Sequence, residues 1–431
     1  MFKKLILSSV FVSILLSDTF QNINIEGLSS KRVLSATQDS SGFVWIGTDE
    51  GLNRFDGYLN KTYGSNVYKE NTLSGNRIWI SYIDRNNTLW IGTDRGICYY
   101  NENEDDFTRI ETGSKPLHVI EDESSVYFTT TSKGVVKVSK ETKGTTFYQF
   151  DPLDPFSLSS SRFSDLQTKP IAKEKDHLWV GTTNGLNQVN IKTGQIKRFY
   201  SGKTDLVKAD SISSVLVTQR GLYIGTTKGL TFMGSDQTTN IKGVTDKNVV
   251  ALFEIKEVNQ VAAIFKDEIQ LLEGFKVVKT IKIEKPFTKM IDLKTGQYLF
   301  TSKNHKETLF LTIENKTINY TKSTVPIKPS CVFVDLEGGI WLTGSKGLLR
   351  AGNTTNPVSV IEGKPIKPGR FSKTKDGLFV LREKQIFKYS KNSQEIKVTG
   401  PIKTTENEKL YVSEDNDMFI YDKAVEKINK D

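Results

Sequence analysis

Cysteine and histidine are scarce in this 431-residue chain, and their scarcity excludes several kinds of structure. The two cysteines, Cys98 and Cys331, lie so far apart that a framework of disulfide bonds is excluded. Both stand in apolar runs, so we expect them to be small buried residues. The three histidines, His118, His177 and His305, share no ligand spacing with one another or with the cysteines. We therefore expect no metal site.

Long hydrophobic runs are also missing, apart from one at the N-terminus. Lys3 and Lys4 precede the apolar run 5–16, and the small residue Ser17 follows it, as is typical of a secretory signal peptide. A membrane anchor is the alternative, but the run is too short to span a bilayer. We therefore expect residues 1–17 to be a signal peptide that exports the chain to the periplasm. A second membrane segment is not expected.

The chain has no arginine-rich block, although its net charge is +9. A net positive charge can indicate binding to nucleic acids or to acidic polymers. Here the lysines are scattered over expected turns and strand ends, where they oppose aggregation of strand edges. We therefore expect no nucleic acid partner. Neither a glycine-rich phosphate loop nor an acidic calcium loop is present, so no cofactor is expected.

The chain does contain a sequence motif, centred on tryptophan, that recurs along its length. Val44–Leu52 reads VWIGTDEGL, and Leu89–Ile97, Leu178–Leu186, Leu222–Leu230 and Ile340–Leu348 are variants of it. With weaker copies, the repeats number ten, and their central residues stand at positions 45, 90, 127, 179, 223, 262, 299, 341, 379 and 411. The mean step of about 41 residues predicts an all-β fold, a β-propeller of four-stranded antiparallel blades.

Ten blades exceed the usual content of one ring, which is about four to eight. We therefore predict a seven-bladed propeller over residues 18–321, followed by three further blades over 322–431 that begin a second, incomplete propeller. Phe20–Ile25 is expected to pair into the seventh blade and close the ring. The alternative is one open arc of ten blades.

Aspartates recur in the turns of the repeats, each six residues before the central tryptophan: Asp39, Asp84 and Asp335. The constant spacing indicates a constant register, and the large rings can wedge between neighbouring blades. Paired carboxylates can cleave glycosides. However, a ring has one active site, and residues that recur from blade to blade are more often part of the scaffold. We therefore expect no catalytic residues and no enzyme.

Parts of the chain resemble a known family. Gly27–Ser30, Gln38–Thr48 and Gly51–Tyr58 closely resemble the two-component-regulator propeller repeat, and Asp151–Ser159 resembles the blade linker of that family. The resemblance implies the periplasmic sensor half of a hybrid two-component system for carbohydrate. It also implies two seven-bladed propellers, a β-sandwich, a membrane helix, a histidine kinase, a receiver and a DNA-binding domain.

This chain departs from the family pattern, because it ends at Asp431 after about ten blades and shows no kinase motif. It is therefore expected to be a sensor fragment, a separately encoded sensor or a degenerate gene product.

Three aligned segments, 28–33, 73–78 and 158–163, each place an arginine where the innermost strand of a blade begins: Arg32, Arg77 and Arg162. The loops leading into these strands ring one mouth of the channel, so the guanidinium groups could converge on an anionic or hydroxyl-rich ligand. Trp79 lies outside the regular series and could stack on a sugar ring. Alternatively, each arginine holds its own linker by donating hydrogen bonds to backbone carbonyls.

These expectations combine into a non-catalytic extracytoplasmic sensor. It would bind an oligosaccharide and signal through a histidine kinase or another partner, with the ligand shifting a population between two arrangements. The chain could also form a homodimer. Two alternatives are a propeller that serves only as a protein–protein interaction scaffold and a propeller-fold glycoside hydrolase or lyase.

Overall fold

The computed structural model describes residues 20–163, 168–234, 238–241, 244, 246–293 and 296–352, together with the strands between 371 and 428. Almost every element is an antiparallel strand, and the 3-10 helix η1 (Lys256–Val258) lies in a loop. The chain divides into two units, 1–352 and 353–431, which we describe separately. The predicted signal peptide lies outside the described residues. In the described part, no helix is both long enough and apolar enough to cross a membrane.

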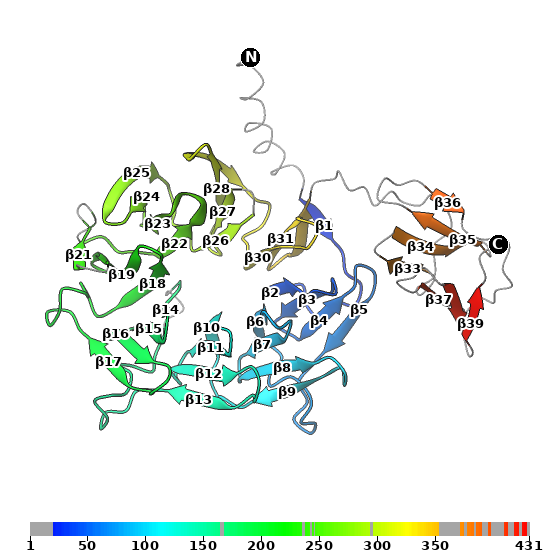
Figure 1. The fold of residues 1–431 in the computed structure, drawn as a ribbon, viewed down its shortest axis with the longest axis horizontal. Coiled ribbons are helices and arrows are strands. Elements are labelled where there is room, and N and C mark those ends of the chain that lie inside the picture. Colours follow the sequence, from blue (N-terminus) through cyan, green and yellow to red (C-terminus); the bar gives the residue numbers. More distant parts are fainter. Residues whose placement is uncertain are drawn as a thin grey trace, which may run out of the picture. The chain divides into compact units, whose positions relative to one another are not determined.

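The first unit is a ring of eight blades, each a four-stranded antiparallel sheet whose first strand lies innermost (Figure 1). Blade 1 contains β2 (Val33–Gln38), β3 (Val44–Thr48), β4 (Leu52–Phe55) and β5 (Asn60–Tyr63). Blade 2 contains β6 (Ile78–Ile83), β7 (Leu89–Thr93), β8 (Ile97–Asn101) and β9 (Asp106–Ile110). Blade 3 contains β10 (Pro116–Glu121), β11 (Ser125–Thr130), β12 (Val135–Ser139) and β13 (Thr145–Tyr148). Blade 4 contains β14 (Ile171–Glu174), β15 (His177–Thr182), β16 (Gly185–Asn190) and β17 (Ile196–Phe199).

The remaining blades of the ring follow the same order. Blade 5 contains β18 (Ile212–Thr218), β19 (Gly221–Thr226), β20 (Gly229–Met233) and β21 (Thr238–Asn240). Blade 6 contains β22 (Ala251–Ile255), β23 (Gln260–Ile264), β24 (Glu268–Glu273) and β25 (Lys276–Lys282). Blade 7 contains β26 (Lys289–Asp292), β27 (Gln297–Thr301), β28 (Glu307–Glu314) and β29 (Thr317–Thr324). Blade 8 contains β30 (Cys331–Val334), β31 (Ile340–Gly344), β32 (Gly347–Ala351) and, as its outermost strand, β1 (Gln21–Ile23).

The propeller of four-stranded blades is confirmed, but the prediction of seven blades is wrong. Blade 7 supplies its own fourth strand, β29, so it has no vacant edge for the N-terminal segment. Blade 8 supplies only three strands, and β1 completes it by pairing Gln21 with Arg350 and Ile23 with Leu348. The ring therefore closes through the eighth blade, and the first unit reaches Gly352 rather than the predicted boundary at 321.

The core lies between the blades. Trp45 of blade 1 belongs to one apolar cluster with Ile78 and Ile91 of blade 2. Trp341 of blade 8 belongs to another cluster, which includes Val33 of blade 1. Both tryptophans are buried. Tryptophan side chains thus fill the space between adjacent sheets on both sides of blade 1. The propeller closes through hydrophobic packing between blades 8 and 1.

Adjacent blades approach each other closely at the glycine of the repeated motif. A Cβ atom at Gly47 would lie 2.6 Å from Cγ2 of Ile78, and one at Gly181 would lie 2.3 Å from Cγ2 of Ile212. Ile78 and Ile212 open the innermost strands of the following blades. Glycine at these positions therefore lets the second strand of one blade touch the first strand of the next.

The second unit contains two described sheets. One has four strands: β33 (Phe371–Thr374), β34 (Gly377–Arg382), β35 (Gln385–Tyr389) and β36 (Glu395–Lys397). The other has three: β37 (Lys409–Val412), β38 (Met418–Tyr421) and β39 (Val425–Ile428). Two of the three blades predicted for residues 322–431 therefore fall in this unit, while the first of them is blade 8 of the ring.

Candidate ligand-binding site

The predicted site lies on the face of the ring where the innermost strands begin, here called the leading face. In each of its three aligned segments, a serine of the linker before the blade forms a hydrogen bond with a threonine at the end of the blade's second strand. The hydroxyl oxygens lie 2.9 Å apart for Ser29 and Thr48, 2.9 Å for Ser74 and Thr93, and 3.0 Å for Ser159 and Thr182. Three residues after each serine stands the predicted arginine. Arg32 and Arg77 immediately precede the innermost strands of blades 1 and 2, but β14 of blade 4 begins only at Ile171, so the prediction that Arg162 stands at the start of an innermost strand is wrong.

The side chains of Arg32, Arg77 and Arg162 are exposed. The Arg32 guanidinium lies 3.8 Å from the carboxylate of Asp49. Within the described residues, none of the three guanidinium groups donates a hydrogen bond to a backbone carbonyl. The interpretation in which each arginine ties down its own linker therefore finds no support here.

The linkers are held by two other arginines, which the sequence reasoning missed. Arg109 on β9 donates to the carbonyls of Thr72 at 2.8 Å and Asn66 at 2.9 Å. Arg198 on β17 donates in the same way to the linker that precedes blade 4. Each arginine lies on the outermost strand of the blade that follows a long linker. That position is the sequence signal that could have identified them.

The structure brings two of the four predicted residues together. Register slips between Ile78 and Ile80 of β6, which makes Trp79 the extra residue of a β-bulge. The Arg77 guanidinium carbon lies 5.9 Å from the centre of the Trp79 ring. The indole nitrogen of Trp79 is buried and has no hydrogen-bond partner among the described residues. An unpaired buried donor costs free energy, and a bound acceptor would remove that cost.

A second cation, Lys115, also lies over the Trp79 ring and was not predicted. Its amino group lies 4.5 Å from the centre of the Trp79 ring. Lys115 immediately precedes β10 and is therefore the counterpart in blade 3 of Arg77 in blade 2. With Arg32, cations stand at equivalent positions of three successive blades. Because cations already approach the face of the indole, stacking of a sugar on this ring would have to displace one of them.

The bulge at Trp79 recurs at the same place in other innermost strands. Register also slips around Leu34 in β2, Leu117 in β10 and Ser213 in β18. Bulges re-aim a side chain away from the regular alternation of a strand. The leading face of blades 1, 2, 3 and 5 therefore presents one additional side chain per innermost strand, and only in blade 2 is it a tryptophan.

A segment that the sequence reasoning passed over runs along the inner edge of blade 5. Lys169 pairs with Ser214 of β18 in parallel, and its carbonyl accepts from Val215 at 2.8 Å. The Thr168 hydroxyl donates to the carbonyl of Val250, which precedes blade 6. Since the outer edge of β18 is used by β19, this segment lies on the channel side. Burial lowers the pKa of the Lys169 amine below its usual range.

The aspartates that recur from blade to blade accept hydrogen bonds from tryptophans of their own blades. Trp45 donates its indole hydrogen to Asp39 at 2.7 Å. The same bond joins Trp90 to Asp84 at 2.9 Å and Trp341 to Asp335 at 2.7 Å. These aspartates therefore fix the central rings, in agreement with the structural role expected of them.

Cysteines and histidines form no candidate metal site within the described residues. Cys98 and Cys331 are free thiols; Cys98 is buried, and burial raises its pKa to about 11, whereas Cys331 is half-buried. The imidazole Nε2 of His305 lies 2.9 Å from the carbonyl oxygen of Pro286 and donates to it.

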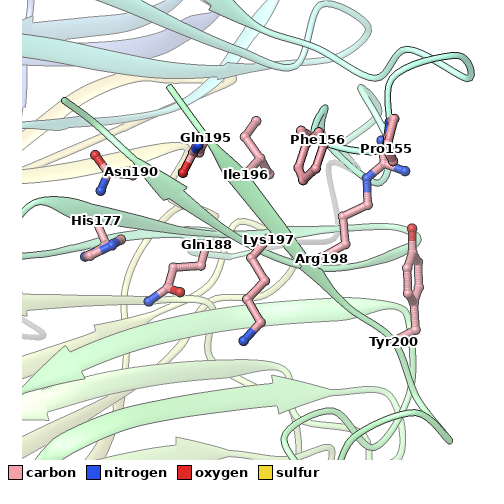
Figure 2. A pocket seen from close by; sticks show the side chains of 10 residues that line it. All are labelled: Pro155, Phe156, His177, Gln188, Asn190, Gln195, Ile196, Lys197, Arg198 and Tyr200. Atoms are coloured by element: carbon pink, nitrogen blue, oxygen red, sulfur yellow. The ribbon is translucent and has the colours of Figure 1, made fainter. Parts of the chain in front are cut away.

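A depression of about 660 Å³ lies at the outer edge of blade 4. Figure 2 shows the residues that line it, which come from β15, β16, β17, the positions directly before and after β17, and the linker before the blade. No sequence-predicted site residue lines this depression.

Comparison with known proteins finds a family match for two of the repeats. The model of the two-component regulator propeller matches residues 27–50 and 72–95. Histidine kinase P4 of Formosa agariphila is 42% identical over 50 residues, which make up 12% of this chain and 4% of that protein.

Two solved structures extend the comparison. The extracellular domain of BT4673 from B. thetaiotaomicron, described as part of a hybrid two-component system, is 19% identical with a TM-score of 0.47. That match covers 95% of this chain and 52% of the domain, so the chain spans about half of its length. Sqt1 from Saccharomyces cerevisiae is 10% identical with a TM-score of 0.56, covering 78% of this chain and 99% of that protein.

The likeness to Sqt1 shows the propeller fold and nothing of function. The family match is more specific, because its two segments include Arg32 with β2 and β3, and Arg77 and Trp79 with β6 and β7. Residues 27–50 and 72–95 are thus repeats of the two-component regulator propeller family, which confirms the resemblance seen in the sequence.

Proposed function

We propose that this chain is an exported, non-catalytic sensor domain that binds an oligosaccharide at its leading face and passes the signal to a histidine kinase. One observation carries the proposal. Arg77, which donates to no linker carbonyl among the described residues, lies beside the indole of Trp79, whose buried nitrogen has no hydrogen-bond partner there. Donors of this kind suit hydroxyl or carboxylate oxygens of a sugar.

The family match and one relative support a signalling role. The matched family is named for two-component regulation, and the P4 relative is named as a histidine kinase. Arg32 and Arg162 each stand three residues after the serine that contacts the second strand of the blade, and they are proposed to extend the same surface. The proposal includes export to the periplasm by a signal peptide at residues 1–17. It also includes formation of a homodimer.

A second candidate is a scaffold that binds only another protein. Tyr68 and Leu153 are 93% and 91% exposed at equivalent positions of two linkers, and exposed apolar side chains can mark protein contacts. A hydrolase or lyase is not proposed, because the recurring aspartates are bonded to tryptophans.

The test compares two arginines with different roles. Arg77→Ala is expected to weaken oligosaccharide binding at least about tenfold, measured by calorimetry, with an unchanged melting temperature. Arg109→Ala is the control and is expected to lower the melting temperature, by about 2–4 °C for each kcal/mol lost, because the linker loses its hydrogen bonds.

If Arg77→Ala lowered binding and melting temperature together, the arginine would belong to the scaffold. Release of reducing sugar from a polysaccharide would point to an enzyme instead.

A further inference from the structure

Three successive blades place a positive charge at the same point of the leading face. In each of them, the main-chain carbonyl of the residue before the innermost strand accepts a hydrogen bond from the residue that follows the second strand. These bonds join Arg32 to Asp49 at 3.3 Å, Arg77 to Asp94 at 3.2 Å and Lys115 to Thr131 at 2.9 Å. Blade 5 makes the same bond with the uncharged Ser211, at 3.3 Å. The bond therefore does not require a cationic residue.

Arg77 is exposed and forms no ion pair among the described residues. In blade 1, by contrast, the Arg32 guanidinium lies 3.8 Å from the carboxylate of Asp49. The corresponding aspartate of blade 2, Asp94, is turned toward the linker, since a Cβ atom at Gly75 would lie 2.4 Å from its Oδ1. An exposed guanidinium without a counter-ion is open to an anion that comes from outside the protein.

Lys115 adds a second positive charge at the same aromatic ring. Its amino group lies 4.5 Å from the centre of the Trp79 ring, and the Arg77 guanidinium carbon lies 5.9 Å from it. The two charges are thus separated by no more than about one Debye length, which is about 10 Å at 0.1 M salt. An ammonium group carries three donors, so Lys115 can attract a ligand in addition to any partner within the protein. Together the two charges favour an anionic ligand over a neutral one.

The indole of Trp79 lacks the carboxylate that the other tryptophans have. The chain contains five tryptophans, and four of them donate the indole hydrogen to an aspartate or a glutamate of the protein: Trp45, Trp90, Trp179 and Trp341. The buried indole nitrogen of Trp79 has no acceptor among the described residues. A buried donor without an acceptor costs free energy. A carboxylate from a ligand would supply the kind of acceptor that the other four rings have.

We propose that the leading-face site selects an anionic sugar, an oligosaccharide of uronic acid whose carboxylate binds the Arg77 guanidinium beside the Trp79 ring. This inference rests on the proposed function and names the class of sugar. A carboxylate matches the planar guanidinium with two parallel hydrogen bonds, which a single hydroxyl cannot form. The sugar is held by its acid group rather than by stacking, since cations already lie over the indole.

The experiment titrates the full chain in a calorimeter with tetragalacturonate, tetramannuronate and tetraguluronate, and with the neutral cellotetraose, xylotetraose and maltotetraose. We expect at least one uronate to bind more tightly than every neutral sugar. Arg77→Ala should weaken that binding at least about tenfold. Arg77→Lys, which keeps the charge but not the planar fork, should have an intermediate effect. Added salt should weaken binding of the uronate and leave that of a neutral sugar unchanged.

Arg95→Ala is the matched control. Arg95 is also an exposed arginine on the leading face of blade 2, in the turn between β7 and β8, but it does not lie over the Trp79 ring. This variant loses the same charge as Arg77→Ala, so we expect its uronate affinity to change less than about twofold. The melting temperatures of all three variants should equal that of the wild type.

The outcomes separate this inference from the proposed function. A neutral sugar that binds at least as tightly as every uronate and loses affinity in Arg77→Ala would overturn the selection of an anion and keep the leading-face sensor. Uronate binding that Arg95→Ala weakens as much as Arg77→Ala would overturn the site, because net charge alone would then attract the ligand. If no sugar of either class bound, the inference and the proposed sugar sensor would both be wrong.

Discussion

Single carboxylates position the largest rings of the core. Asp39 accepts three hydrogen bonds, from the backbone of Ser41 and Phe43 at 3.0 Å and from the Trp45 indole at 2.7 Å. Blade 4 keeps the arrangement with a longer carboxylate, since Trp179 donates to Glu174 at 2.8 Å. The bond orients each ring as it enters the space between blades, so one residue links a turn to an interface.

Replacing this carboxylate should cost more than replacing an exposed one with similar backbone contacts. Asp56 also accepts two backbone hydrogen bonds, from Tyr58 at 2.7 Å and Leu59 at 2.6 Å, but it has no ring partner. We expect Asp39→Ala to lower the free energy of unfolding by about 2–3 kcal/mol and Asp56→Ala by less than about 1 kcal/mol. Urea denaturation measures both, and equal effects would contradict a role for the indole bond.

The relation between Asp39 and Trp45 could be predicted from the sequence, because both residues stand in one hairpin. The roles of Arg109 and Lys115 could not be predicted. Their partners, Thr72 and Trp79, lie 36 or more residues away in the chain, and no local pattern reports a contact between separate strands.

At the scale of the element, β24 of blade 6 carries a buried carboxylate at one end and an exposed one at the other. Glu268 is 4% exposed and accepts from Lys247 at 2.7 Å and Lys282 at 2.6 Å. The hydrogen bond from Lys247, followed by that from Lys282, lowers the pKa of Glu268 to about 2. The strand is thereby tied to its neighbour β25, which contains Lys282, and to the loop before the blade.

This pKa predicts a pH-dependent stability. The ordinary value is 4.5, so the stabilisation from Glu268 is complete above about pH 4.5 and is lost as the pH falls toward 2. At pH 7, Glu268→Gln should lower the free energy of unfolding by about 1–3 kcal/mol. The difference from the wild type should shrink steadily below pH 4.5 in denaturation curves.

Glu273 at the other end of β24 provides the control. It is exposed and pairs with Arg220 at 2.9 Å, and exposed pairs contribute about 0–1 kcal/mol. Glu273→Gln should therefore change stability little at any pH. A gap between Glu268→Gln and the wild type that stayed constant down to pH 2 would contradict the assignment.

At the scale of the whole molecule, the ring is closed by a strand from the opposite end of the unit. β1 covers the edge of β32, and Ile25, just beyond β1, packs with Val33 and Trp341 at the junction of blades 8 and 1. A circular fold gains its last interface only when this strand is in place, so closure should make the eight blades unfold together.

Truncation tests this closure. A chain lacking residues 20–26 should melt at a lower temperature and exchange the amide hydrogens of β32 faster than the full chain, because that edge is then unpaired. A chain that ends at Gly352 keeps all eight blades and should melt its ring at the same temperature as the full chain. If both truncations lowered the melting temperature equally, the second unit would be part of the ring's stability.

The sequence by itself determined the blade: the period, the four strands and the spacing of aspartate and tryptophan all lie within about 40 consecutive residues. Only the tertiary structure decided how many blades close one ring, because that number depends on the angle between packed sheets and on which vacant edge accepts β1. It also decided which cations meet at Trp79, since these contacts join side chains that adjacent sequence does not connect.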